Sequence, residues 1–199
     1  MDTEKLFEII ESKKEEYINF LKETAEIESP TTYKKGVDAV GEYFIKKGEE
    51  KGFKTEVFKQ EKAGNAVIIT MNPDSKEKPV CLSGHMDTVH PVGSFGEPCV
   101  KFEDNKMIGP GVCDCKGGCV NAFWAMDALK EMGYNKRPVM LLLQSDEETS
   151  SRESNCETIK YIIKKAENAV AFFNMEPCVY ETSVILERKG IAKKVVKKI

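Results

Sequence analysis

The spacing of apolar positions divides the chain into segments with helical periodicity and segments typical of strands. Apolar residues recur at helical spacing from Thr3 to Ile27 with charged residues between them, which predicts one amphipathic helix there. We predict further helices over 35–51, which Gly52 ends, over 117–132 after a glycine-rich turn, and over 154–165.

Short apolar runs separate these helices and predict strands over 53–59, 66–71, 80–83, 139–145 and 169–174. Several of the runs lack an alternation of apolar and polar residues, so we expect strands buried on both faces. Strands that alternate with helices predict one α/β domain, a mostly parallel mixed sheet flanked by helices. The polar segment 72–79, NPDSKEKP, is typical of a hairpin-type loop rather than of a domain boundary.

The composition narrows the possible partners. Of the 199 residues, 41% are hydrophobic and 32% are charged, which is typical of a folded globular protein. The net charge is −3 and Lys and Glu are interspersed, which argues against a nucleic-acid partner. We recognise no signal peptide and no membrane span, and the seven cysteines, an odd number, favour reduced thiols; we therefore expect a cytoplasmic protein without a membrane partner.

A histidine and an aspartate follow the predicted strand 80–83. His85 stands just past the strand, and Asp87 comes two residues later. A carboxylate this close can hold one imidazole tautomer, which leaves the other ring nitrogen free for a metal ion. The ordinary alternative for Asp87 is an Asx turn that ends the strand.

Further carboxylates follow the later elements. Asp114 lies between two pairs of glycines in GPGVCDCKGG, before a predicted helix N-terminus, where it could also be a helix cap. Asp146, Glu147 and Glu148 directly follow a strand, where a nearby cation would relieve their mutual repulsion; the alternative is an ordinary solvated acidic loop. Glu176 follows the last strand. Imidazole and carboxylates at four successive strand ends predict a divalent metal site of nitrogen and oxygen ligands.

In order and spacing, the motifs SGHMDTVHP, GPGVCDCKGG, DEETSS and MEP resemble those of the co-catalytic zinc peptidase family. That family includes glutamate carboxypeptidases, acetylornithine deacetylase, succinyl-diaminopimelate desuccinylase, tripeptidases and aminoacylases. The resemblance implies that Asp114 bridges two Zn²⁺ ions, with Co²⁺ or Mn²⁺ as possible substitutes. It further implies that His85 and Glu176 bind one ion and Glu148 the other, that Asp87 orients the imidazole, and that Glu147 is the general base.

The resemblance also implies an activity and a domain arrangement. The expected reaction is hydrolysis of an amide bond in a small peptide or an N-acyl amino acid, in the manner of a glutamate carboxypeptidase. Residues 1–188 would be the N-terminal part of a zinc-exopeptidase catalytic domain, and 189–199 the start of a lid and dimerisation domain. The full-length form is therefore expected to be a homodimer.

Two other interpretations stand beside this one. The family's remaining metal ligand is a histidine farther along a longer chain, whereas this sequence holds only His85 and His90. The alternative function is accordingly a truncated, catalytically incompetent relative that binds at most one metal. A rival site would gather Cys113, Cys115 and Cys119 around a soft ion with Cys81 or Cys99, although these thiols lack the Cys-x-x-Cys pairs of structural zinc sites.

Overall fold

The central sheet has five strands in the order β1-β2-β6-β3-β7. The computed structural model describes residues 2–178. Strand β6 pairs antiparallel with β2 and parallel with β3, and β3 pairs parallel with β7, so the predicted mixed α/β sheet is confirmed. The strands are β1 (Lys54–Phe58), β2 (Ala66–Met71), β3 (Val80–His85), β6 (Val139–Gln144) and β7 (Ala171–Asn174).

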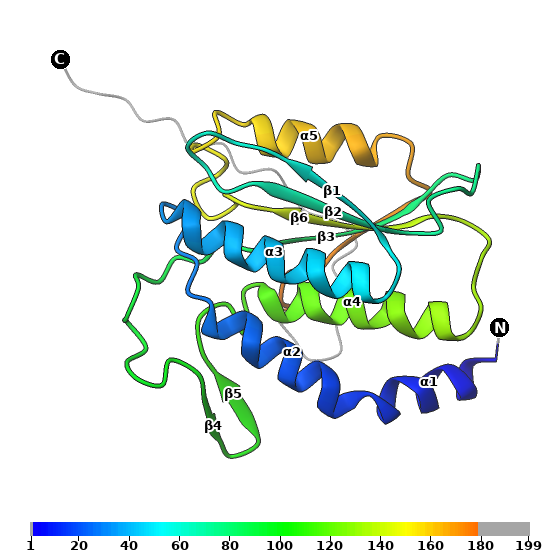
Figure 1. Ribbon diagram of the computed structural model, residues 1–199, viewed down its shortest axis with the longest axis horizontal. Helices are drawn as coiled ribbons and strands as arrows, with labels where there is room; N and C mark the ends of the chain where they lie inside the picture. Colours follow the sequence, from blue (N-terminus) through cyan, green and yellow to red (C-terminus); the bar gives the residue numbers. More distant parts are fainter. Residues whose placement is uncertain (1, 179–199) are drawn as a thin grey trace.

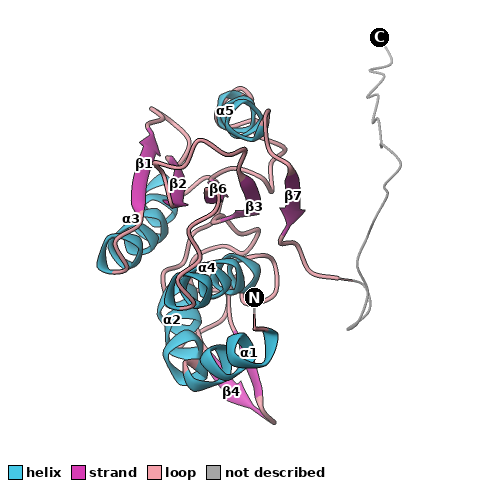
Figure 2. Ribbon diagram, turned by 90° about the vertical axis from the view of Figure 1, so that its right-hand side faces the viewer, coloured by secondary structure: helices cyan, strands magenta, loops and turns pink. Residues whose placement is uncertain are grey.

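Helices cover both faces of this sheet (Figure 1). Figure 2, seen end-on, shows α5 on one face, α3 and α4 on the other, and α1 and α2 as an outer layer beneath α4. The flanking helices that the periodicity predicts are thus present. They are α1 (Thr3–Ser12), α2 (Lys14–Glu26), α3 (Lys34–Glu50), α4 (Lys116–Glu131) and α5 (Glu157–Ala166).

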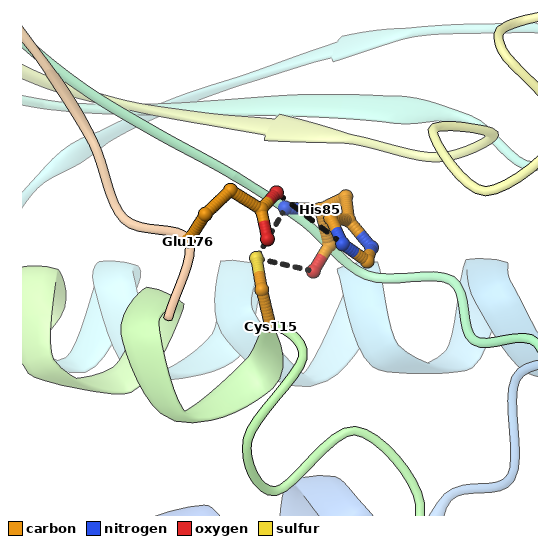
Figure 3. Close-up of side chains that lie close together, drawn as sticks. All are labelled: His85, Cys115 and Glu176. Carbon is orange, nitrogen blue, oxygen red and sulfur yellow. Dashed lines mark hydrogen bonds and ion pairs between the residues drawn. The ribbon is translucent and has the colours of Figure 1, made fainter. Parts of the chain in front are cut away.

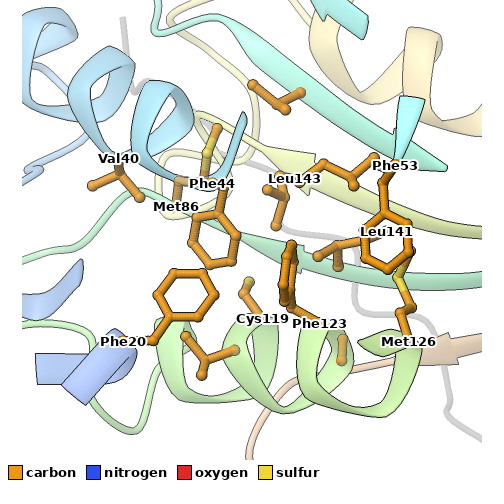
Figure 4. Packing of buried hydrophobic residues seen from close by; sticks show 14 of the residues in the cluster. Phe20, Val40, Phe44, Phe53, Met86, Cys119, Phe123, Met126, Leu141 and Leu143 are labelled. Atoms are coloured by element: carbon orange, nitrogen blue, oxygen red, sulfur yellow. The ribbon is translucent and has the colours of Figure 1, made fainter. Parts of the chain in front are cut away.

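The larger core lies between the sheet and the α3/α4 layer (Figure 4). Phe123 of α4 is 1% exposed, and its ring centroid lies 5.3 Å from that of Phe20 and 5.7 Å from that of Phe53. Burial of one such ring contributes about 1.5–3 kcal/mol to folding. This packing holds α4 against β3 and β6, which directs the N-terminal end of the helix toward the carboxyl ends of those strands.

The single helix predicted from Thr3 to Ile27 is wrong, because α1 and α2 are separate helices that break at Lys13. Lys13 has φ −103° and ψ 5°, outside the helical range. Its Nζ lies 2.7 Å from Asp127 Oδ2 and 2.6 Å from Glu131 Oε2, both on α4. The spacing of apolar residues carries no information about ion pairs to a distant helix, so it could not reveal the break.

The predicted hairpin at 72–79 is also wrong. Strands β2 and β3 are not neighbours, because β6 lies between them. β6 is almost entirely buried, and the centre of the sheet is where an apolar strand loses the most contact with water. A two-residue hairpin turn instead joins β4 (Lys101–Glu103) to β5 (Lys106–Ile108) through Asp104 and Asn105, both at positive φ, as such turns require.

The end of the described chain departs from prediction in two ways. Helix α5 begins at Glu157 instead of Ser154, and β7 covers only 171–174 of the predicted 169–174. The latter segment was expected to be buried, yet Phe172 and Phe173 are 51% and 53% exposed. Within the described residues β7 is the edge of the sheet, so it has one neighbouring strand instead of two. The predicted domain boundary at 188/189 lies outside the described residues.

Candidate metal centre

The parallel strands of the sheet bring three chain segments together at their carboxyl ends. His85 is the last residue of β3, Glu147 and Glu148 follow β6, and Glu176 follows β7. Because β6, β3 and β7 are adjacent and parallel, their carboxyl ends meet. Asp114 comes from the loop before α4 rather than from a strand, so the expectation of four strand ends is wrong for this residue.

His85 is buried and holds its ring in one orientation. Its Nδ1 lies 2.9 Å from the backbone oxygen of Asp87 and 3.3 Å from Asp87 Oδ1. The carbonyl oxygen is therefore the nearer acceptor for an Nδ1 proton, with the carboxylate beside it. Donation from Nδ1 leaves Nε2 as the free ring nitrogen, the arrangement typical of a metal-binding histidine.

The free nitrogen of His85 faces carboxylates. Nε2 lies 3.0 Å from Asp114 Oδ1 and 3.4 Å from Glu176 Oε1, and Figure 3 shows the Glu176 carboxylate beside the imidazole ring. Glu148 joins His85 and Asp114 in a group whose possible ligand atoms all lie within 4.8 Å of one another. All four predicted metal ligands, His85, Asp114, Glu148 and Glu176, thus lie at one site.

Asp87 connects the histidine to the acidic turn after β6. Its carboxylate is fully buried and accepts hydrogen bonds from the Thr31 hydroxyl at 2.7 Å and from the backbone N–H groups of Glu147 and Glu148, each at 3.1 Å. Burial by itself would raise the pKa of Asp87, but hydrogen bonds from His85, Thr31 and Glu148 hold it below its ordinary value. One carboxylate therefore positions both the imidazole and the pair of glutamates.

The third acid of this run, Asp146, does not belong to the cluster. It is fully buried, and its carboxylate accepts from the Ser154 backbone N–H at 2.9 Å and from the Thr158 hydroxyl. These donors satisfy it without a cation, so the expectation that all three acids need one is wrong for Asp146. Its role is to fold the turn that leads into α5.

The turn itself has an unusual backbone. Ser150 and Ser151 both have φ 56°, a left-handed conformation that side chains rarely adopt. Hydrogen bonds hold it: the Ser150 N–H donates to the Glu147 carbonyl at 2.6 Å, the Ser151 N–H to the Asp146 carbonyl at 2.8 Å, and the Gln144 amide to the Ser151 hydroxyl at 2.7 Å. The strained turn aims Glu147 and Glu148 at the site.

The electrostatics of the cluster fit a divalent cation. Burial raises the pKa of Glu148 to about 7; the nearby His85 opposes this, and the carboxylates of Asp114, Asp87 and Glu147 add to it. The pKa of Glu147 is raised for the same kinds of reason, by desolvation first and by neighbouring carboxylates. A divalent cation would relieve this repulsion, and imidazole with carboxylate oxygens is a donor set that zinc accepts.

The carboxylates act in the opposite direction on the imidazole. Burial lowers the pKa of His85, yet hydrogen bonds with Asp87, Cys115 and Glu176 outweigh burial and raise it above its ordinary value. The hydrogen bond from His85 lowers the pKa of Glu176 against the effect of burial. A cation bound at Nε2 would take the place of that extra proton.

A buried lysine, Lys116, supports the Asp114 loop and was missed by sequence reasoning. Its Nζ donates to the carbonyls of Thr24 at 3.2 Å and Ile27 at 2.8 Å, at the C-terminal end of α2, where unpaired carbonyls attract cations. Its stem packs against Gly111, where an added Cβ would come within 2.8 Å. Burial lowers the pKa of Lys116 to about 7. A lysine between a cysteine and two glycines gives no sequence signal for such an anchor.

The thiols do not form the rival cysteine site. In residues 2–178, no group of three thiols brings its sulfur atoms within ligand range. Cys81 packs with Ile68, Leu142 and Ile162 in the smaller core, and Cys113 is exposed. Cys115 and Cys119 are buried with their Sγ atoms 3.9 Å apart, and a hydrogen bond between them together with burial raises the pKa of Cys115.

The second histidine lies apart from the cluster. His90 is exposed, and its ring packs against Phe95 with 4.9 Å between the centroids. It belongs to neither group of possible ligands among the described residues. His85 is therefore the one imidazole of the candidate centre within residues 2–178.

Comparison with known proteins gives a consistent match. The model of "Peptidase family M20/M25/M40" matches residues 81–190, more than half of the chain. Carboxypeptidase G2 of Pseudomonas sp. (strain RS-16) is 29% identical over 150 residues, which cover 73% of this chain and 36% of that protein.

Solved structures share the fold. The metallo-carboxypeptidase Sso-CP2 from Sulfolobus solfataricus aligns with a TM-score of 0.61 at 23% identity, over 88% of this chain and 37% of that one. The di-peptidase Dug1p from Saccharomyces cerevisiae aligns with a TM-score of 0.65 at 17% identity, over 85% and 39%. The chain thus spans little more than a third of the length of these proteins. None of the helices in residues 2–178 has both the length and the apolar character needed to cross a bilayer.

Proposed function

The chain belongs to peptidase family M20/M25/M40, and from that premise we propose that it carries the metal centre of a hydrolase that cleaves an amide bond in small peptides or N-acyl amino acids. The observation that carries the proposal is the free Nε2 of His85, which faces Asp114 and Glu176 at 3.0 and 3.4 Å. A divalent cation at this nitrogen would relieve the repulsion among the carboxylates that surround it.

We assign the metal ligands as follows. His85 and Glu176 would hold one ion, Glu148 would hold a second, and Asp114 would be a ligand of both. Zinc is the proposed metal, with Co²⁺ or Mn²⁺ as alternatives that the same donors accept. A bound divalent metal supplies Lewis acidity, which polarises the scissile carbonyl and makes a water molecule easier to deprotonate.

Glu147 is the proposed general base. Its backbone N–H donates a hydrogen bond to the Asp87 carboxylate, which fixes the backbone from which the Glu147 side chain extends, next to Glu148. A carboxylate whose pKa is raised accepts a proton from water more readily than an ordinary surface glutamate does. The same carboxylate then delivers that proton to the nitrogen of the leaving amine. Asp87 remains a positioning residue, because it acts through His85 and the glutamate turn.

The substrate class, the domain arrangement and the dimer are further parts of the proposal. Carboxypeptidase G2 is among the similar proteins, which supports a substrate with a free carboxylate and favours a glutamate carboxypeptidase-like activity. We propose that 1–188 belong to the catalytic domain and that 189–199 lead into a lid through which the full-length form dimerises. The cytoplasm is the proposed location.

The general-base assignment is tested with Glu147→Gln, measured in a form of the protein that hydrolyses N-acyl amino acids or dipeptides. Hydrolysis should fall by about 10²–10⁴-fold, the usual worth of a general base. Metal content should stay unchanged, because Glu147 is not an assigned ligand. Glu61→Gln, an exposed glutamate outside the site, is the matched control. Full turnover in Glu147→Gln would refute the role.

A second candidate function is a metal-binding chain without turnover. It is favoured by the fact that both groups of possible ligands among residues 2–178 share the same histidine, His85. One imidazole cannot serve two metal ions through a single nitrogen. Metal analysis of the 199-residue chain separates the two candidates: at most one tightly held zinc supports the second, and two support the complete centre.

A further inference from the structure

We propose that Cys115 is a thiolate ligand of the metal ion held by His85 and Glu176, so that this ion has nitrogen, oxygen and sulfur donors. The inference rests on the proposed metal-binding function and adds a residue that the nitrogen and oxygen centre assigned above does not contain. It assigns a chemical role to one cysteine of the seven in the chain.

The position of the sulfur carries the proposal. Cys115 Sγ, a ring nitrogen of His85 and a carboxylate oxygen of Glu176 all lie within 4.8 Å of one another. Figure 3 shows the Glu176 carboxylate next to the sulfur and beside the imidazole, while the sulfur itself contacts the His85 backbone. Ligand atoms on one zinc ion are roughly 3–4 Å apart, given metal–ligand distances of about 2.0–2.3 Å, so a small contraction would bring them together.

The backbone holds the sulfur at this place. Cys115 is fully buried at the residue before α4, and the His85 backbone N–H donates to its Sγ at 3.1 Å. Cys115 directly follows Asp114, so the loop before α4 presents a carboxylate oxygen and a sulfur side by side. On metal binding the S–H bond breaks, an S–metal bond forms, and the proton passes to the solvent.

Cys119 provides a matched comparison. It is as buried as Cys115 and lies one helical turn later, where its Sγ contacts the His85 carbonyl at 3.4 Å. It belongs to neither group of possible ligands, although it shares the same apolar core. If Cys115 were only a small apolar side chain, as buried cysteines commonly are, the two thiols should behave alike.

X-ray absorption of the 199-residue chain loaded with one equivalent of Zn²⁺ tests the proposal. We expect a zinc–sulfur shell at about 2.3 Å beside nitrogen and oxygen ligands at about 2.0–2.2 Å. Cys115→Ser should lose the sulfur shell, and Cys119→Ser should keep it. A sulfur shell that survives in Cys115→Ser overturns the assignment.

A wild-type spectrum with nitrogen and oxygen ligands alone also overturns the proposal and leaves the proposed metalloenzyme function intact. Failure of the chain to bind zinc at all overturns both. Should Cys115→Ser not fold, a variant with serine at 99, 113, 119, 156 and 178 retains only Cys81, which packs in the other core, and Cys115. That variant must keep the sulfur shell; its loss refutes the role of Cys115.

Discussion

Two buried carboxylates, Asp87 and Asp127, contrast in the partners that surround them. Asp87, at the candidate metal centre, accepts from a hydroxyl and two backbone N–H groups and lies beside an imidazole. Asp127, on α4, accepts from the ammonium groups of Lys13 at 2.7 Å and Lys51 at 2.9 Å and from the Tyr17 hydroxyl at 2.9 Å.

The two carboxylates serve different purposes: Asp127 joins helices to one another, whereas Asp87 positions residues of the candidate metal centre. Long, flexible lysine side chains let Asp127 join α1, α2 and the end of α3 to α4, but they do not set the position of any group closely. Short backbone donors around Asp87 fix two consecutive peptide groups and, through them, the proposed general base Glu147 and the proposed metal ligand Glu148. We therefore expect loss of Asp127 to cost stability alone, and loss of Asp87 to cost both stability and metal binding.

The largest effect is expected for Asp87→Ala. It leaves the Thr31 hydroxyl and two N–H groups without their acceptor, so the free energy of unfolding should fall by about 3 kcal/mol or more. Zinc affinity should fall by about 10–100-fold, as for other groups that orient a metal-binding histidine. Denaturant unfolding and zinc titration measure the two quantities. Asp146→Ala is the control: it removes an equally buried carboxylate of the same turn, but one that does not contact His85, so it should lower stability without disturbing the imidazole.

A smaller and pH-dependent effect is expected for Asp127→Asn. Burial raises the pKa of Asp127, but hydrogen bonds from Lys13, Lys51 and Tyr17 hold it below the ordinary value of 3.8. A carboxylate with a lowered pKa stabilises the fold above pH 3.8, and this contribution is lost as the pH falls through the folded-state pKa. The variant should therefore be about 1–3 kcal/mol less stable than wild type at pH 7 and closer to it at pH 3.

Thermal unfolding at the two pH values measures this difference. Zinc affinity of Asp127→Asn at pH 7 should equal that of wild type, because Asp127 does not contact the centre. If the stabilities of wild type and Asp127→Asn change equally with pH, the ion pairs of Asp127 do not stabilise the fold. If the variant binds zinc more weakly, Asp127 also affects the metal centre, and the proposed difference between Asp127 and Asp87 is wrong.

The smallest effect is expected for Ser150→Gly in the turn that Asp87 holds. Glycine adopts positive φ at no steric cost, so the substitution should raise stability by about 0.5–1 kcal/mol after the greater entropy of the unfolded chain is included. Zinc affinity should not change, because Asp87 still holds both N–H groups. Denaturant midpoints measure the gain, with Ser94→Gly at an exposed loop position as the control. A loss of stability in Ser150→Gly would show that the turn carries no strain at this position.

Much of this molecule follows from local sequence. The α/β class, the helices that flank the sheet and the buried strand β6 all appear in the periodicity, because each residue's burial repeats with the geometry of its own element. The sequence also brings His85, Glu148 and Glu176 into one hypothesis, since the carboxyl ends of adjacent parallel strands meet, whereas Asp114 reaches the site from the loop before α4.

Tertiary structure decided the rest. Whether Asp146 joins its two neighbours, whether β6 enters between β2 and β3, and where the first helix breaks all depend on partners far along the chain, such as Thr158 and Asp127. The same holds for Cys115, which the sequence offers as one thiol among several and the fold places beside an imidazole and a carboxylate. The sequence shows which residue types a site could use. The distances between their side chains depend on how the elements pack, so packing determines which of them come together.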